Sequence, residues 1–251
     1  MVDASARYGH PFGQPVTQAV VESLEADTLR ITGDEAHHLL KSLRLKPQAR
    51  FVATDGAGTV ARLELTASDR RGLEARVLER ASVPRPALRF WLVGDAEGTR
   101  GDWLVEKATE LGAWAFVPLE DPGPGRRARW GRVSRAALKQ SLGAWALALP
   151  DPGVLDADTA GTASTGPRFD GLWLADPEGA PLLAQELPSQ GDWLLVSGPP
   201  GGFAAAEREA WLGRPGSAAV GLGPLRLRAE SAALALLVGA RLRSSTGQET
   251  A

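Results

Sequence analysis

The chain has 251 residues, of which 43% are hydrophobic and 23% charged, so one large or two modest globular domains are expected. Its formal net charge of −2 argues against a general polyanion binder, and the absence of cysteine excludes disulfides and cysteine nucleophiles. With only three histidines, no metal centre is expected. No apolar run approaches the roughly 18 residues of a bilayer span, and residues 1–4 lack the features of a secretory signal, so a cytoplasmic location is expected.

Residues 1–80 are predicted to form a small β-barrel domain. Short β-rich segments are separated by turn residues: Leu29–Ile31, Arg50–Thr54, Val60–Leu65 and Leu73–Leu78. Residues 55–58 predict a hairpin connection. Residues 34–43 predict one helix with Asp34 as its N-cap. Two prolines then make residues 81–87 an extended linker.

From Leu88 onward, apolar strand patterns alternate with helical patterns. Strands are predicted at Leu88–Val93, Trp114–Val117, Leu172–Ala175, Trp193–Val196 and Ala218–Leu222, and helices at Asp102–Leu111, Arg126–Leu142 and Glu230–Leu242. Continuous apolar strands between helices favour a parallel sheet covered on both faces. Residues 88–243 therefore predict one α/β domain, followed by a tail at 244–251, and residues 151–170 predict a long, mobile connection.

Positive charge is concentrated in three parts of the chain. No acid lies between Glu35 and Asp55, where Lys41, Arg44, Lys46 and Arg50 are found. A second basic island covers residues 126–139 and a third covers residues 214–243. Such islands fit a nucleic-acid surface on one face of the protein. They equally fit solvated helix faces in an arginine-rich protein.

Three glycine- and proline-rich turns follow predicted strands in the C-terminal half. They lie at residues 176–179, 198–203 and 221–224. Because such turns expose backbone amides and carbonyls without side-chain bulk, a flat or bent ligand can lie against them. Loops at the ends of consecutive parallel strands are also where open α/β sheets bind cofactors. Ordinary strand–helix connections have the same composition.

Four motifs, in order, resemble the bacterial 16S ribosomal RNA uridine (N3) methyltransferases, the RsmE family of the SPOUT superfamily. The N-terminal pair His37-His38-Leu39 and Leu43-Arg44-Leu45-Lys46 is similar to the family's H-H-L…L-R-L-K. Residues 106–112 resemble E-K-x-T-E-L-G, residues 198–203 resemble G-P-E-G-G-F, and residues 222–232 resemble L-G-x-R-I-L-R-x-E-T-A. Together they cover most of residues 30–243.

The resemblance implies a PUA-like RNA-binding domain followed by a SPOUT domain. The SPOUT domain would have a C-terminal trefoil knot that holds S-adenosylmethionine. It would be completed by homodimerisation, and the substrate would be ribosomal RNA or the 30S subunit. The implied cofactor-binding residues are Leu174, Gly198, Pro199, Gly201, Gly202, Leu222, Gly223 and Leu227. Arg228 would stabilise negative charge on the uracil carbonyls, and Glu230 would orient Arg228, cap the helix or contact the cofactor.

RNA contact is predicted for His37, His38, Arg44, Lys46, Arg129 and Arg132. For the two histidines, packing or RNA contact is favoured over metal binding, because adjacent residues at a helix start point in different directions.

The chain departs from the family pattern where substrate recognition is expected. Pro200 replaces the glutamate of G-P-E-G-G, and Leu225 replaces the first arginine of R-I-L-R. Leu142 follows Gln140-Ser141 near an expected arginine. We therefore expect cofactor binding to survive and methylation of the family's usual uridine to be slow or redirected.

Other enzyme classes lack their signatures in this chain. No G-x-G-x-x-G follows the first strand, and neither a Walker A lysine loop nor a G-x-S-x-G elbow is present. The remaining alternative is an RNA-binding or interaction protein of the same fold whose methylation activity is lost or altered.

Overall fold

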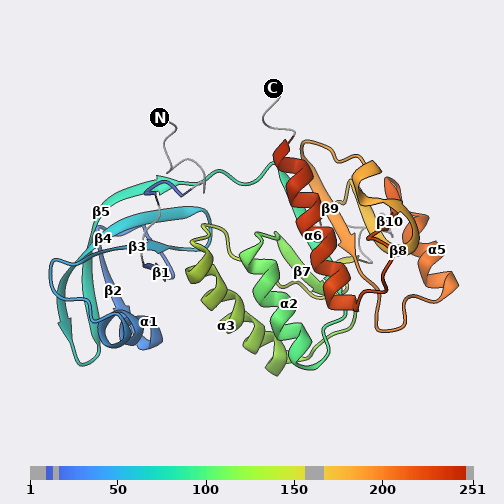
Figure 1. The fold of residues 1–251 in the computed structure, drawn as a ribbon. Helices are drawn as coiled ribbons and strands as arrows, with labels where there is room; N and C mark the ends of the chain where they lie inside the picture. Colours follow the sequence, from blue (N-terminus) through green and yellow to red (C-terminus); the bar gives the residue numbers. More distant parts are fainter. Residues whose placement is uncertain (1–9, 14–16, 156–166, 247–251) are drawn as a thin grey trace. The chain divides into compact units, whose positions relative to one another are not determined.

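The computed structural model describes residues 10–13, 17–155 and 167–246. The chain divides into two compact units, one of residues 1–85 with 135–146 and one of residues 86–134 with 147–251 (Figure 1). Part of the predicted connection at 151–170 lies outside the described residues. No helix in the described ranges combines the length and apolarity needed to cross a membrane.

The first unit is built on a mixed five-stranded sheet. Its strands are β1 (Gln18–Val20), β2 (Thr28–Thr32), β3 (Arg50–Thr54), β4 (Thr59–Asp69) and β5 (Gly72–Ser82). The strand order is β1-β3-β4-β5-β2; β1 runs parallel to β3 and the other pairs are antiparallel. Register shifts between β4 and β5 after Arg62 and Leu65 mark bulges, which bend strands around a core. The predicted barrel is therefore an open half-barrel with β1 and β2 at its edges.

The predicted helix at 34–43 is wrong in two details. An α-helix, α1 (Gly33–His37), continues directly as a π-helical turn at His38–Ser42. The N-cap is Thr32 and not Asp34, because strand β2 runs up to Thr32 with no loop before the helix.

The second unit contains a five-stranded, wholly parallel sheet. Its strands are β6 (Leu88–Gly94), β7 (Ala115–Pro118), β8 (Gly171–Pro181), β9 (Gly191–Val196) and β10 (Ser217–Gly221), in the order β10-β8-β9-β6-β7. The helices are α2 (Gly98–Glu110), α3 (Pro124–Ser141), α5 (Ala205–Leu212) and α6 (Ala229–Thr246), with a 3-10 turn at Leu182–Ala184. By the division into units, the end of α3 belongs to the first.

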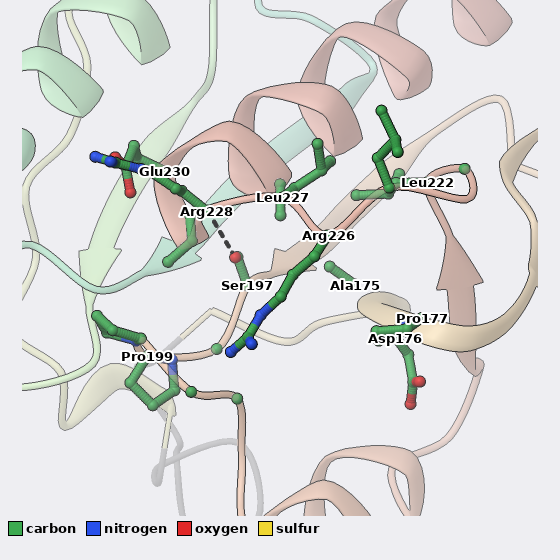
Figure 2. Close-up of a pocket in the computed structure, with 18 of the residues that line it drawn as sticks. Ala175, Asp176, Pro177, Ser197, Pro199, Leu222, Arg226, Leu227, Arg228 and Glu230 are labelled. Atoms are coloured by element: carbon green, nitrogen blue, oxygen red, sulfur yellow. Dashed lines mark hydrogen bonds between the residues drawn. The ribbon is translucent and has the colours of Figure 1, made fainter.

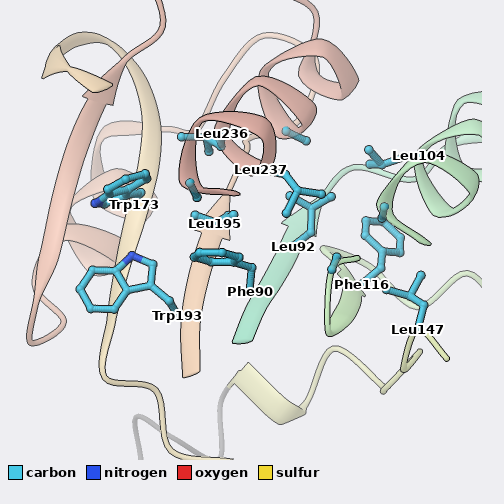
Figure 3. Packing of buried hydrophobic residues seen from close by; sticks show 14 of the residues in the cluster. Phe90, Leu92, Leu104, Phe116, Leu147, Trp173, Trp193, Leu195, Leu236 and Leu237 are labelled. Carbon is cyan, nitrogen blue, oxygen red and sulfur yellow. The ribbon is translucent and has the colours of Figure 1, made fainter. Parts of the chain in front are cut away.

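Both faces of this sheet are buried, as the continuous apolar strands predict. On one face Phe90, Leu92 and Leu195 pack with Leu236 and Leu237 of α6 (Figure 3). On the other face, Trp91 and Val93 of the same strand β6 belong to a second cluster, which Trp211 and Leu212 of α5 flank. The side chains of adjacent residues in one strand thus pack on opposite faces of the sheet.

Several predicted element ends differ from the structure. Helix α2 begins at Gly98 rather than Asp102, and its N-cap is Glu97. Gly101 lies inside this helix, and a Cβ there would lie 2.3 Å from the carbonyl oxygen of Ala96, so close packing explains this glycine. Strand β5 continues to Ser82, and α6 to Thr246.

Candidate functional site

A cavity of about 810 Å³ opens in the second unit where several strands of its sheet end (Figure 2). Its wall comes from part of β8 at residues 175–177, the loop after β9 at 197–202 and the segment from the end of β10 into α6 at 222–232. Arg100 of α2 also lines it. The volume lies within the range of small-molecule sites, about 300–1,000 Å³.

An irregularity in the pairing of β8 with β10 forms one wall. Ala219 pairs with Leu174, but the next residue, Val220, pairs with Ala180. Residues 175–179 are therefore left out of the ladder with β10. The turn predicted at 176–179 exists as this excursion within β8, because the chain pairs with β10 again before the strand ends.

Two interactions pin the excursion. Asp176, whose side chain is buried, accepts a hydrogen bond of 2.5 Å from Nε of Arg208 in α5, and its other oxygen accepts from the backbone N–H of Glu178. A Cβ on Gly179 would lie 2.4 Å from the backbone nitrogen of Val220. Only glycine allows so close an approach of the two backbones.

Glycines also shape the loops that face the cavity. Gly201, Gly202 and Gly223 have φ angles of +104°, +88° and +113°, and an added Cβ would meet no atom within 4 Å. These glycines are needed for their backbone conformation, and they leave open space where a ligand can approach the main chain. This cradle of backbone groups fits a flat or bent cofactor.

The loop after β9 is anchored from behind. A Cβ on Gly198 would lie 3.0 Å from the ring of Phe203, so this glycine lets Phe203 pack under the loop. Ser197 is buried, and its hydroxyl donates to the carbonyl oxygen of Ala229 at the start of α6. The cavity walls at 197–202 and 222–232 are thereby joined.

The structure places most of the predicted cofactor-binding and catalytic residues on this one cavity. Those that line it are Gly198, Pro199, Gly201, Gly202, Leu222, Gly223, Leu227, Arg228 and Glu230. Leu174 does not; it is 1% exposed and packs in the core, and its neighbour Ala175 lines the wall.

More arginine side chains line the cavity than the sequence predicts. Arg100 and Arg226 line the cavity in addition to Arg228. The alternation Leu225-Arg226-Leu227-Arg228 is the only sequence signal for Arg226, and it does not tell which of these side chains points inward. Glu230 lies in the first turn of α6, where its charge suits the helix dipole.

The two groups of predicted RNA-binding residues differ in their partners. His37, His38, Arg44 and Lys46 lie within ten residues of chain in the first unit. Arg44 has a φ of +55°, and neither Arg44 nor Lys46 forms an ion pair with another described residue. In the second unit Arg129 is paired with Asp102 at 2.5 Å, whereas Arg132 has no ion pair within the described ranges.

The other basic residues of α3 serve structure. Arg126 donates to the carbonyls of Ala96 and Gly98, and Arg127 pairs with Asp121 and Asp151. In the first unit, Arg135 donates to Val20 O and Lys139 pairs with Glu35. Among the described residues, no group of three or more His, Cys, Asp or Glu side chains could hold a metal ion.

Comparison with known proteins assigns this architecture to a class. Residues 90–240 match the family described as an RNA methyltransferase domain, and residues 31–78 match an RNA methyltransferase PUA domain. The chain thus has the domains of an RNA methyltransferase with an N-terminal PUA domain.

Two curated relatives narrow the class. Ribosomal RNA small subunit methyltransferase E of Bacillus subtilis is 29% identical over 231 residues, covering 84% of this chain and 88% of that protein. The protein of the same name from Mycobacterium bovis is 33% identical over 228 residues, covering 82% and 83%. The chain therefore belongs to the ribosomal RNA small subunit methyltransferase E family.

A solved structure shares the fold. The enzyme of this name from Neisseria gonorrhoeae, bound to S-adenosyl methionine, superposes with a TM-score of 0.75 at 22% identity, covering 90% of this chain and 97% of that one.

Proposed function

We propose that this chain transfers a methyl group from S-adenosylmethionine to N3 of a uridine in small-subunit ribosomal RNA. The observation that carries the proposal is the cavity at the strand ends, with its cradle of positive-φ glycines, in a chain of the ribosomal RNA small subunit methyltransferase E family. The assignment of small-subunit ribosomal RNA as substrate follows from the relatives' name, and the assignment of uridine N3 follows from the family resemblance.

The residues present fit S-adenosylmethionine. The backbones of Gly198, Gly201, Gly202 and Gly223 offer hydrogen-bonding groups without side chains in the way. Leu222, Leu227 and Pro199 provide apolar surface for a purine ring. We assign the cofactor to this cradle, with Ala175 in place of Leu174 at its wall.

When bound, S-adenosylmethionine supplies an electrophilic methyl group: N3 of the uracil forms a bond to carbon and loses its proton to solvent, and the carbon–sulfur bond pair returns to sulfur as a neutral thioether. The chain's part is to position the base and to stabilise the charge that develops on it. A guanidinium near the flanking carbonyl oxygens does this, and we assign that role to Arg228.

Glu230 is assigned to contact with a ligand rather than to orienting Arg228. No ion pair joins it to Arg228, and its carboxylate has no hydrogen-bond partner among the described residues. A carboxylate that lines a cavity and lacks a partner is available to a cofactor hydroxyl or amine.

RNA binding is assigned first to the first unit, which contains the PUA match. Arg44 and Lys46 are exposed cations without ion pairs in the described part, and His37 and His38 lie nearby in the chain. From the second unit, Arg132 adds a cation that has no ion pair among the described residues, whereas Arg129 is engaged by Asp102. We further propose that the protein acts as a homodimer and that the assembled 30S subunit is its substrate.

Calorimetry with S-adenosylmethionine and S-adenosylhomocysteine tests the cofactor site, and we expect about one site per chain. Transfer of labelled methyl to 30S subunits and to free RNA, both from a strain lacking the endogenous activity, tests the substrate. A dissociation constant of about 1 mM corresponds to a binding free energy of about 4 kcal/mol. If neither ligand binds at that concentration, the alternative of an RNA-binding protein without turnover is favoured.

A further inference from the structure

Three guanidinium groups that line the cavity have no ion pair. Arg100, Arg226 and Arg228 all contribute to its wall, and none lies within ion-pair distance of a carboxylate among the described residues. Elsewhere in the described part of the chain, other arginines are paired with carboxylates, as Arg30 is by Asp69 and Arg89 by Asp192. Positive charge left unpaired around one cavity indicates an anionic ligand.

The carboxylates of the cavity do not cancel this charge. Asp176 is engaged by Arg208, and only Glu230 remains. Figure 2 shows the side chain of Arg226 running from its loop across the cavity towards the loop that contains Pro199. Its neighbour Leu225, which is 79% exposed, also lines the cavity. Of these two side chains, only that of Arg226 can bind an anion.

The reacting end of S-adenosylmethionine does not account for these arginines. Its sulfonium and amino groups are cations, which a guanidinium repels, and its adenosyl group is neutral. The cofactor has one anionic group, the carboxylate of its methionine part. An RNA strand, by contrast, brings a phosphate on each side of the target nucleotide.

The α2 side of the cavity has features of an RNA-binding surface. Trp103 is 42% exposed and is the one aromatic among the large, exposed apolar side chains of the described residues. It lies three residues after Arg100, so the two side chains share a face of α2. Single-stranded RNA is bound by aromatic platforms combined with cations.

We propose that Arg226 binds a phosphate of the substrate RNA next to the target uridine and thereby determines where on the RNA the cavity engages. The inference rests on the proposed function. It also explains how the chain manages without an arginine at position 225: the guanidinium is supplied from the next position. Arg226 is a substrate-binding residue in this account and has no role in holding the cofactor.

The test compares the variants Arg226→Ala and Arg226→Lys with Arg70→Ala, which removes the same charge from an exposed site in the first unit. RNA affinity is measured over a range of salt concentrations, and S-adenosylhomocysteine affinity by calorimetry. We expect Arg226→Ala to weaken RNA binding about tenfold and to reduce the salt slope by about 0.7, the value for one phosphate on a single strand. Arg226→Lys should recover most of the affinity, and no variant should change cofactor affinity.

Two results would overturn the proposal. Loss of cofactor affinity with unchanged RNA binding in Arg226→Ala would assign Arg226 to the cofactor carboxylate. An RNA affinity in Arg226→Ala equal to that of Arg70→Ala would show that Arg226 makes no contact. The double variant Leu225→Arg/Arg226→Ala should recover less RNA affinity than Arg226→Lys, because Arg226 is the side chain that extends across the cavity; full recovery would contradict the assignment to position 226.

These readouts do not need turnover. If the wild-type chain binds RNA but neither binds the cofactor nor transfers methyl, the proposed function fails, and the effect of Arg226→Ala on RNA affinity still decides this inference.

Discussion

The hydroxyl of Ser197 donates a hydrogen bond of 2.8 Å to the carbonyl oxygen of Ala229, 32 residues later in the chain. It joins the end of β9 to the first turn of α6, and the loops that adjoin these two points form most of the cavity wall. Because the loops are held together before any ligand arrives, the site is preorganised.

Ser197→Ala should therefore weaken cofactor binding more than it lowers the stability of the protein. A buried hydrogen bond contributes about 1 kcal/mol, so the dissociation constant for S-adenosylhomocysteine should rise by about three- to tenfold. Calorimetry measures the affinity and urea unfolding the stability. An unchanged affinity would show that the loops hold their positions without this bond.

Gly201→Val should abolish cofactor binding. The φ of +104° at Gly201 is strongly unfavourable for a β-branched residue, and the side chain would project into the open space of the cavity. Gly125→Ala is the matched control, since this glycine lies in α3, has an ordinary φ and has no atom within 4 Å of an added Cβ.

The control should gain about 0.5–1 kcal/mol in stability and bind the cofactor normally. If Gly201→Val binds S-adenosylhomocysteine as tightly as wild type, the cofactor does not lie against this loop.

Arg241 tests how the helices of the second unit are held together. It lies on α6 and donates to the carbonyls of Leu111 and Gly112 at the end of α2, and desolvation by burial lowers the pKa of Arg241 from its ordinary value. It thus satisfies carbonyls that a helix end leaves without partners.

Arg241→Met should lower the free energy of unfolding by about 1–3 kcal/mol, because the two carbonyls lose a charged donor. The midpoint of urea unfolding measures this. A raised midpoint would mean that the desolvation of the guanidinium outweighs its hydrogen bonds.

Charge reversal separates RNA-binding cations from structural ones. Arg44→Glu with Lys46→Glu should weaken RNA binding and flatten its salt dependence without changing stability, because neither residue forms an ion pair in the described part of the chain. On α3, Arg132→Glu is the equivalent test. Arg129→Glu is not, because it would place a carboxylate opposite Asp102. A wild-type salt slope in the first double variant would show that Arg44 and Lys46 are merely solvated.

Much of the fold could be predicted because its strands carry unambiguous patterns. The run Leu88–Val93 is apolar throughout since both faces of its strand are buried, and Arg50–Thr54 forms a strand with the predicted bounds. The start of α2 at Gly98 was predicted too late in the chain, at Asp102, because glycines such as Gly98 and Gly101 are typical of loops. The excursion within β8 depends on pairing with β10, which local sequence does not encode. The trefoil knot that the resemblance implies stays a prediction.

The site could be predicted where backbone conformation dictates the residue and not where side-chain direction matters. Glycines at 201, 202 and 223 mark the cradle directly. Arg100 is distant in the chain from the other lining residues, and only the structure shows that the side chain of Arg226 extends across the cavity. The expectation that Leu225 makes methylation of the family's usual uridine slow or redirected must therefore take the neighbouring Arg226 into account.

The most direct measurement is transfer of labelled methyl from S-adenosylmethionine to 30S subunits lacking the endogenous modification, comparing wild type with Arg228→Ala. We expect stoichiometric incorporation at N3 of one uridine by the wild type. For Arg228→Ala we expect incorporation to fall at least about 100-fold, the usual effect of removing one charge-stabilising donor, with S-adenosylhomocysteine affinity unchanged. No incorporation by the wild type into either 30S subunits or free ribosomal RNA, despite normal cofactor binding, would contradict this expectation.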